Sequence, residues 1–274
     1  MSYAKRRYLK PSVFWSIRQG FPNWLHPLLL ASSLLVPFII WCVLSYGGFI
    51  SPKFLPTPTA TVLTGIEMLR DEELMVDIVA SSLRVLAGFF FAALIGIPVG
   101  LLMGTFYSMD GLLGGFFRTV RYAPIAAFVP LIIIWTGLGE TPKIIIIFLG
   151  IVFYNATMIS DAVKFISDET LNVAYTLGAT RRDLLFRVIL PATLPNIIDT
   201  LKLNVAGAWN FLIISELIAA QKGLGFKIIY SQRFLQTDKV LFCILIILAI
   251  GLATDLFFKL IFWLCLPWAE SKTS

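Results

Sequence analysis

The residue types that bind metals or form disulfides are scarce in this chain. The cysteines are Cys42, Cys243 and Cys265, all inside apolar runs, and the only histidine is His26. One histidine with scattered cysteines does not build a zinc site, and the sequence has no CxxC pattern. We therefore expect no metal ion, and we interpret these side chains as small apolar cysteines and an interfacial histidine.

Nucleotide chemistry is not predicted either. The sequence lacks the G-x-x-x-x-G-K-[ST] loop, whose backbone amides cradle phosphates. Gly137-Leu138-Gly139-Glu140 is rich in glycine, but it has no lysine and stands at the end of an apolar run. We therefore expect no catalytic residues and no cofactor in this chain.

Charged residues within apolar stretches are the next candidates, because a charge in hydrocarbon usually faces a cavity or a partner. They are Arg84, Asp199, Lys202, Glu216, Asp255 and Lys259. Asp199 and Lys202 are three residues apart, and Asp255 and Lys259 are four apart, so each pair suits an ion pair along one helix. Arg84 lies near a helix end and could snorkel. We interpret all six first as charges that hold helices together.

A pathway for anions would need positive charges and hydrogen-bond donors along it. Side chains of these types stand in or beside the apolar stretches: Arg121, Lys202, Asn204 and Asn210. Asn210 falls near the middle of its stretch, where a polar side chain needs a partner. Because one sequence does not fix the rotation of a helix, packing between helices remains the alternative interpretation for each.

The polar segment 164–191 carries the most specific pattern in the chain. Ser167 or the aspartate after it can cap a short helix, and Gly178 can end that helix in a left-handed conformation. Thr180 can cap a second helix, with Asp183 three residues later in a capping-box position. The segment therefore predicts two short helices between two apolar stretches.

Both predicted short helices are amphipathic. Their apolar residues are Leu171, Ala174, Tyr175 and Leu177 on the first, and Leu184, Leu185 and Val188 on the second. A short amphipathic helix held on a rigid hairpin can fit the groove of a cytoplasmic partner. An ordinary helix at the membrane interface would show the same pattern. These residues alone leave both interpretations open.

The composition requires a membrane around these elements. Of 274 residues, 58% are hydrophobic and 14% are charged, and the mean hydropathy is +0.86. A soluble domain of this size would leave much of that apolar surface in water. We therefore predict an all-α fold, a polytopic membrane helix bundle. The net charge of +6 does not indicate nucleic acid, because Lys and Arg gather at cytoplasmic loops of membrane proteins.

A membrane-spanning helix needs roughly 20 mostly apolar residues. Six stretches qualify: Pro27–Gly47, Ile78–Phe106, Leu112–Trp135, Thr141–Val163, Leu194–Ala220 and Val240–Leu266. The first is too long for a signal peptide and is expected to stay uncleaved. A loop is expected over Gly48–Asp77, and within it a short helix over Thr59–Arg70, with prolines before the helix and acidic residues after it.

The expected organisation has three parts. Residues 1–26 form an N-terminal segment, 27–267 the transmembrane domain with its polar loop 164–191, and 268–274 a tail. Lys and Arg are more numerous in the segments expected on the same side of the membrane as the N-terminus than in those on the opposite side. By the positive-inside rule both termini are cytoplasmic.

Small residues recur every four positions in the second stretch. They are Gly88, Ala92, Gly96, Gly100 and Gly104. This spacing places them along one face of a helix, where another helix backbone can approach closely. We interpret the stripe as a packing surface inside the bundle.

The polar segment resembles the EAA loop of ABC importer permeases. That motif runs E-A-A, three residues, G, nine residues, I, one residue and L-P. Asn172-Val173-Ala174 stands at its start, Gly178 matches the glycine, Val188 stands at the isoleucine, and Leu190-Pro191 matches the ending. The spacing is kept in full, whereas the glutamate and the first alanine are replaced.

Other segments are similar to the nitrate/sulfonate/taurine/bicarbonate branch of these permeases. They are residues 55–58, 82–89, 130–131, 135–140, 223–226 and 233–238. The resemblance therefore covers most of the chain, and it implies the type I ABC importer permease fold.

The resemblance also implies function and partners. Two permease copies, expected as a homodimer in the lipid bilayer of the plasma (inner) membrane, would form a pathway for a small oxyanion or sulfonate. Cytoplasmic ATP-binding subunits would bind ATP and Mg, and an extracytoplasmic solute-binding protein would deliver the solute. No nucleic acid is expected as a partner. The residues implied to couple to the ATPase are Ala174, Tyr175, Leu177, Gly178, Ala179, Arg181, Arg182, Leu190 and Pro191.

An autonomous secondary transporter or channel is the alternative. It would be expected to carry paired ionisable groups near mid-membrane and often an inverted repeat. The sequence has no evident repeat, and its charges gather near the ends of the apolar stretches.

Overall fold

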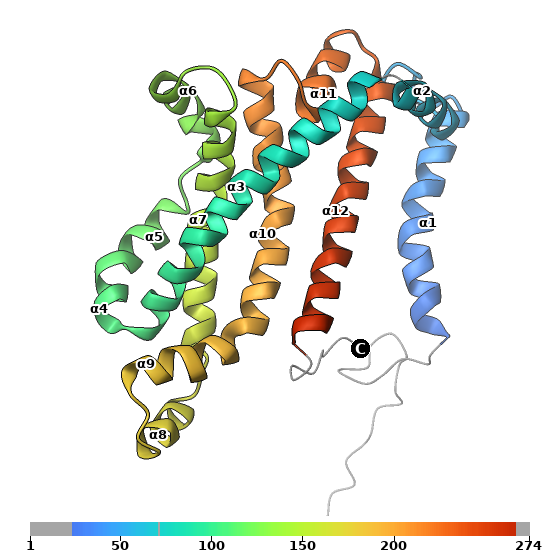
Figure 1. The fold of residues 1–274 in the computed structure, drawn as a ribbon. Helices are drawn as coiled ribbons and strands as arrows, with labels where there is room; N and C mark the ends of the chain where they lie inside the picture. Colours follow the sequence, from blue (N-terminus) through green and yellow to red (C-terminus); the bar gives the residue numbers. More distant parts are fainter. Residues whose placement is uncertain (1–23, 71, 267–274) are drawn as a thin grey trace, which may run out of the picture. The chain divides into compact units, whose positions relative to one another are not determined.

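The computed structural model describes residues 24–70 and 72–266, and within these residues the regular structure is helical throughout (Figure 1). Contacts divide the chain into two units, residues 1–60 and 61–274. The predicted N-terminal segment 1–26 and tail 268–274 lie almost wholly outside the described residues.

The first unit is built around helix α1, Leu25–Tyr46. Its 22 residues are long and apolar enough to cross a membrane, and most of them are exposed. The Trp41 indole N–H donates to the Pro56 carbonyl at 3.0 Å, and the Tyr46 hydroxyl donates to Thr59 at 3.0 Å. These bonds hold the following loop against the end of α1.

The second unit contains most of the helices. Its longer helices are α3 (Glu72–Thr105), α7 (Thr141–Lys164), α10 (Leu190–Ala219) and α12 (Thr237–Cys265). The shorter elements are α2 (Pro58–Arg70), which starts in the first unit, α4 (Tyr107–Met109), η1 (Asp110–Gly114), α5 (Gly115–Val120), α6 (Ile125–Thr136), α8 (Asp168–Thr176), α9 (Arg181–Asp183), η2 (Leu184–Ile189) and α11 (Leu224–Arg233). The elements η1 and η2 are π-helical.

Among the described residues, five helices meet the length and composition of a membrane span, and a bent pair gives a sixth. The bent pair replaces the continuous span predicted over Leu112–Trp135, which is wrong. Residues Tyr107–Val120 and Ile125–Thr136 form two pieces at 101° to one another. Pro124 stands at the break; it has no N–H to donate, and it disfavours helical geometry at the residue before it.

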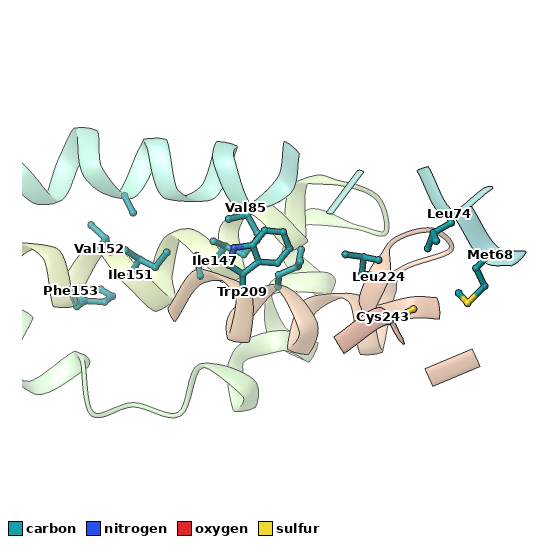
Figure 2. Close-up of a cluster of buried hydrophobic side chains, with 13 residues drawn as sticks. Met68, Leu74, Val85, Ile147, Ile151, Val152, Phe153, Trp209, Leu224 and Cys243 are labelled. Carbon is teal, nitrogen blue, oxygen red and sulfur yellow. The ribbon is translucent and has the colours of Figure 1, made fainter. Parts of the chain in front are cut away.

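Helix α7 lies at the centre of the second unit, with α3 and α10 along it (Figure 1). Its buried side chains join those of the neighbouring helices in one apolar cluster. Figure 2 shows part of this cluster, with Val85 of α3, Ile147 of α7 and Trp209 of α10 together. Leu224 of α11 and Cys243 of α12 extend it (Figure 2).

The stripe of small residues on α3 faces α7, which confirms its interpretation as a packing surface. A Cβ atom placed on Gly88 would lie 2.6 Å from Ile147, and one on Gly96 would lie 2.7 Å from Asn155. At Gly100 the nearest atom is the carbonyl oxygen of Ala156, at 2.7 Å. Glycine is required here because the two backbones approach so closely.

Replacing Gly100 with alanine is expected to destabilise the protein by about 1–3 kcal/mol, because the added methyl group meets a backbone atom that cannot rotate away. Thermal unfolding of the purified chain measures this. Gly251→Ala is the matched control, since a Cβ at Gly251 of α12 meets nothing within 4 Å and alanine favours a helix. Equal stability of the two variants would contradict the close approach of α3 and α7.

Candidate functional site

The polar segment 164–191 begins with a capped short helix, as predicted. The Ser167 hydroxyl accepts from the Thr170 N–H at 3.4 Å and caps the start of α8. Gly178 has a φ of +86°, and two backbone bonds close the helix end: Gly178 N–H to the Tyr175 carbonyl at 2.9 Å, and Ala179 N–H to the Ala174 carbonyl at 3.0 Å. This pair of bonds is a Schellman motif, which a left-handed glycine allows.

The second predicted helix begins as expected and ends differently. Thr180 and Asp183 form a capping box, which confirms that prediction. The helix then continues without a break through the π-helical turn η2 into α10, so the expectation of a separate short helix is wrong. Leu184 and Ile189 are buried and anchor this continuous stretch, while Pro191 lies in the first turn of α10. Because the helix continues through this point, the proline removes one backbone donor from it.

The apolar side chains of α8 have little cover in this chain, and α8 has no buried residue. Val173 and Tyr175 are exposed, and the Leu177 residue is 82% exposed. Arg181 and Arg182 are exposed beside them. The other implied coupling residues, Ala174, Ala179, Leu190 and Pro191, are half-buried, and Gly178 is exposed. The segment therefore presents an apolar and basic surface at the C-terminal end of α7.

An ion-pair cluster lies at the base of this segment. The Asp110 carboxylate binds Arg118 at 2.9 Å and Lys164, the last residue of α7, at 2.8 Å. These pairs connect the α4–α5 region to α7 three residues before the Ser167 cap. They restrain the start of the segment.

The four predicted pathway residues differ in their contacts and exposure. Arg121, at the end of α5, contacts Tyr122 at 3.1 Å and Thr157 of α7 at 3.4 Å. The Asn204 side-chain N–H donates to the Asn155 side-chain oxygen of α7 at 2.6 Å. Asn210 is exposed.

Lys202 forms an ion pair with a different helix from the one predicted. Its ammonium lies 2.8 Å from Asp255 of α12, so the expected pairing with Asp199 within α10 is wrong. Asp255 also binds Lys259 at 3.0 Å, which confirms the pair expected within α12. Lys202 and Asp255 therefore link α10 to α12.

A buried polar network that was not predicted lies at the other end of α7. The Arg84 side chain is only 5% exposed, so it does not snorkel; its ion pair with Glu216 of α10 agrees with its interpretation as a charge that holds helices together. Its Nη1 binds the Glu216 carboxylate at 2.6 Å and the Lys222 carbonyl at 2.8 Å. The Glu216 side chain is fully buried and also accepts from Ser81 at 2.7 Å and from the Gly225 N–H at 2.7 Å.

The loop before α11 closes around this network. The Leu224 N–H donates to the Ser81 hydroxyl at 2.9 Å, and the Gly223 N–H donates to Asp77 at 2.7 Å. Gly223 has a φ of +127°, and a Cβ there would lie 2.6 Å from Arg84, so a side chain would be strained and crowded. The sequence did contain a pattern that indicates this network. Arg84, Glu140 and the segment 223–226 lie in three of the stretches that resemble one branch of permeases.

Glu140 completes the network from the loop between α6 and α7. Its carboxylate binds Arg84 through two bonds, at 2.5 Å and 2.8 Å, and Lys143 at 2.9 Å. The hydrogen bonds from Arg84 in particular lower the pKa of Glu140 to about 2. The Glu140 side chain is 59% exposed, whereas that of Lys143 is 4% exposed. Glu140 therefore covers two buried cations.

The lowered pKa predicts how the stability depends on pH. The contribution of the charged Glu140 is fully present above its usual pKa of 4.5 and is lost as the pH falls towards 2. We expect the wild type to unfold at a higher temperature than Glu140→Gln at pH 7, by a modest margin because the carboxylate is exposed to solvent. The margin should shrink below pH 4.5. A margin that stays constant down to the lowest measurable pH would contradict the ion pair.

No group of three or more His, Cys, Asp or Glu side chains in the described ranges is arranged to hold a metal ion. The site consists of helix caps, an exposed apolar helix and buried ion pairs.

Comparison with solved structures identifies the class of fold. The chain is similar to a chain of the MetNI methionine ABC transporter, which was solved in an inward-facing conformation. The TM-score is 0.59 and the identity 18%, and the match covers 70% of this chain and 97% of that chain. It is also similar to a chain of a bacterial alginate ABC transporter, with a TM-score of 0.56, 15% identity, and coverage of 88% and 96%. The fold is that of an ABC importer permease.

The family follows from sequence. Residues 96–262 match the family described as "Binding-protein-dependent transport system inner membrane component", and the chain belongs to it. It is 34% identical to the taurine transport system permease protein TauC of Escherichia coli, over 90% of this chain and 93% of that protein. It is 32% identical to a putative aliphatic sulfonates transport permease protein of Bacillus subtilis, over 91% and 89%. A bicarbonate transport system permease protein of Synechococcus elongatus is 29% identical over 93% and 94%. The chain is thus a multi-pass inner-membrane permease of an ABC importer.

Proposed function

We propose that this chain forms the translocation pathway of an ATP-driven importer for a small oxyanion or sulfonate. The single observation that carries the proposal is the match over nearly the whole chain to a permease named for taurine transport. Relatives named for aliphatic sulfonates and bicarbonate support the same class of solute, since all three carry an anionic group with terminal oxygens. Nitrate belongs to the same class.

The coupling to ATP is proposed to run through the segment 164–191. Its exposed apolar residues, Tyr175 and Leu177, stand on a helix that is capped at both ends, so a partner's groove would meet a preformed surface. The partner would be an ATP-binding subunit that binds ATP and Mg and carries out the hydrolysis. The segment is then proposed to lie in the cytoplasm, on the same side of the membrane as the N-terminus.

The complete importer is proposed to contain a second copy of this chain and a solute-binding protein on the far side of the membrane. One fold neighbour supports the solute-binding protein, because it was solved with a periplasmic protein bound. The pathway residues Arg121, Lys202, Asn204 and Asn210 stay a prediction. Among them, Asn210 is the one whose side chain lies exposed on α10 and free to face a second copy or a pathway.

Uptake of labelled taurine by cells that produce this chain with its partner subunits tests the solute class. We expect uptake to depend on the chain, and to be reduced by excess methanesulfonate or bicarbonate but not by a neutral analogue such as dimethyl sulfone. Equal competition by the neutral compound, or taurine uptake that is the same without the chain, would contradict the proposed solute class.

A further inference from the structure

Two buried cations share one exposed carboxylate at the end of α7 that lies opposite the segment 164–191. Arg84 and Lys143 are 5% and 4% exposed, and Glu140 lies over both of them. The same place is hollowed by a cavity of about 990 Å³, lined by these three residues and by Leu138, Ile144 and Lys222. Glu140 therefore covers the two cations where they border the cavity.

Glu140 contacts these cations as a bound oxyanion would. Its two oxygens accept from Nε and Nη2 of Arg84, the paired geometry that a guanidinium offers to carboxylates and other planar or tetrahedral oxyanions. One of the oxygens also accepts from the Lys143 ammonium at 2.9 Å. A sulfonate or carboxylate ligand could make the same three contacts.

The charges around Glu140 favour a ligand with a single negative charge. Glu216 remains bound to Nη1 of Arg84 and neutralises one of the two cations. If Glu140 moves away, Arg84, Lys143 and Glu216 together carry one excess positive charge in a mostly buried place. The one negative charge of a sulfonate or carboxylate group would restore the balance, whereas a molecule without an anionic group would leave a buried charge unpaired.

The position of Glu140 allows it to move away. It follows Gly137 and Gly139, whose φ values are +77° and +144°, and a Cβ on either glycine would meet nothing within 4 Å. The loop therefore has little side-chain packing to hold it, and its exposed glutamate can rotate into water. Arg84 and Lys143, in contrast, are fixed on the long helices α3 and α7.

We propose that Arg84 and Lys143 form a binding site for small oxyanions, and that Glu140 is a built-in competitor that occupies the site until a monoanion displaces it. The inference deepens the proposed function and rests on it for the class of ligand. In a working importer this site would receive the anion at the end of the bundle remote from the ATPase-coupling segment.

Equilibrium binding of radiolabelled methanesulfonate to the full chain in lipid nanodiscs tests the inference. Glu140→Ala removes the competitor, and we expect it to tighten binding by about tenfold or more, because the site no longer spends most of its time occupied. Glu140→Gln keeps the side-chain size and should also tighten binding. The control is Glu67→Ala, which removes an exposed carboxylate from α2 and should leave the affinity unchanged.

Two further measurements distinguish binding at a specific site from non-specific attraction of anions to positive charge. Lys143→Met in the Glu140→Ala background should reverse the gain, and dimethyl sulfone should not compete. Unchanged affinity in both Glu140 variants, or an equal gain in Glu67→Ala, would overturn the inference. If binding fails while ATP-driven sulfonate uptake is normal, the inference is wrong and the proposed function stands. If binding follows the prediction without any uptake, the proposed function is wrong and the anion site stands.

Discussion

Arg84→Met is expected to lower the free energy of unfolding by about 3–5 kcal/mol, the largest effect of any single change considered for this chain. The substitution removes the cation from Glu216, whose side chain is fully buried, and leaves that carboxylate charged without its main partner. It also removes the bonds from Arg84 to Glu140, which then keeps only Lys143, and it removes the donor to the Lys222 carbonyl. Denaturant or thermal unfolding of the purified chain in detergent measures the loss.

The control for Arg84→Met is Lys259→Met. Lys259 forms an exposed pair with Asp255 on α12, so the same kind of change should cost no more than about 1 kcal/mol. The double variant Arg84→Met/Glu216→Gln should recover part of the loss, because the unpaired charge is then gone. An Arg84→Met variant as stable as Lys259→Met would show that the network does not hold these helices together.

Leu177→Asp is expected to weaken association with the ATP-binding subunit by about a hundredfold while the chain itself stays folded. Leu177 is 82% exposed, so an aspartate there meets water and no buried neighbour in the isolated chain. In a complex the same carboxylate would be buried in the partner's groove. A hundredfold loss of affinity is typical when a residue central to an interface is replaced. Co-purification and a titration of the two subunits measure the affinity.

Leu235→Asp is the matched control for this change. Leu235 is 62% exposed and lies between α11 and α12, at the end of the bundle remote from α8. Its φ of +55° is one that aspartate tolerates well, so the chain should fold and bind the ATPase as before. If both variants keep the ATPase, or both lose it, the segment 164–191 is not the docking element.

Local patterns predicted local structure well. The Ser167 cap, the left-handed Gly178 and the Thr180–Asp183 capping box were all readable, because a cap is made by residues three or four positions apart. The break at Pro124 was missed, because counting apolar residues over a window takes no account of a proline that ends the helix.

The contacts between helices were the part that local patterns did not predict. Lys202 forms an ion pair with Asp255, and Arg84 forms ion pairs with Glu140 and Glu216. These partners are far apart in the sequence, and whether they meet depends on how each helix is rotated about its axis. Hydropathy places a helix in the membrane but does not set its rotation. The stripe of glycines on α3 was the exception, since a face made only of small residues indicates by itself where another helix packs.

The most direct measurement of the central claim is solute uptake by proteoliposomes that contain this chain with its ATP-binding subunit and solute-binding protein. We expect labelled taurine or methanesulfonate to accumulate only when all three proteins and hydrolysable ATP are present, and we expect Leu177→Asp to abolish the accumulation. Uptake by this chain alone, without the ATP-binding subunit, would contradict the proposed function and would favour an autonomous transporter or channel.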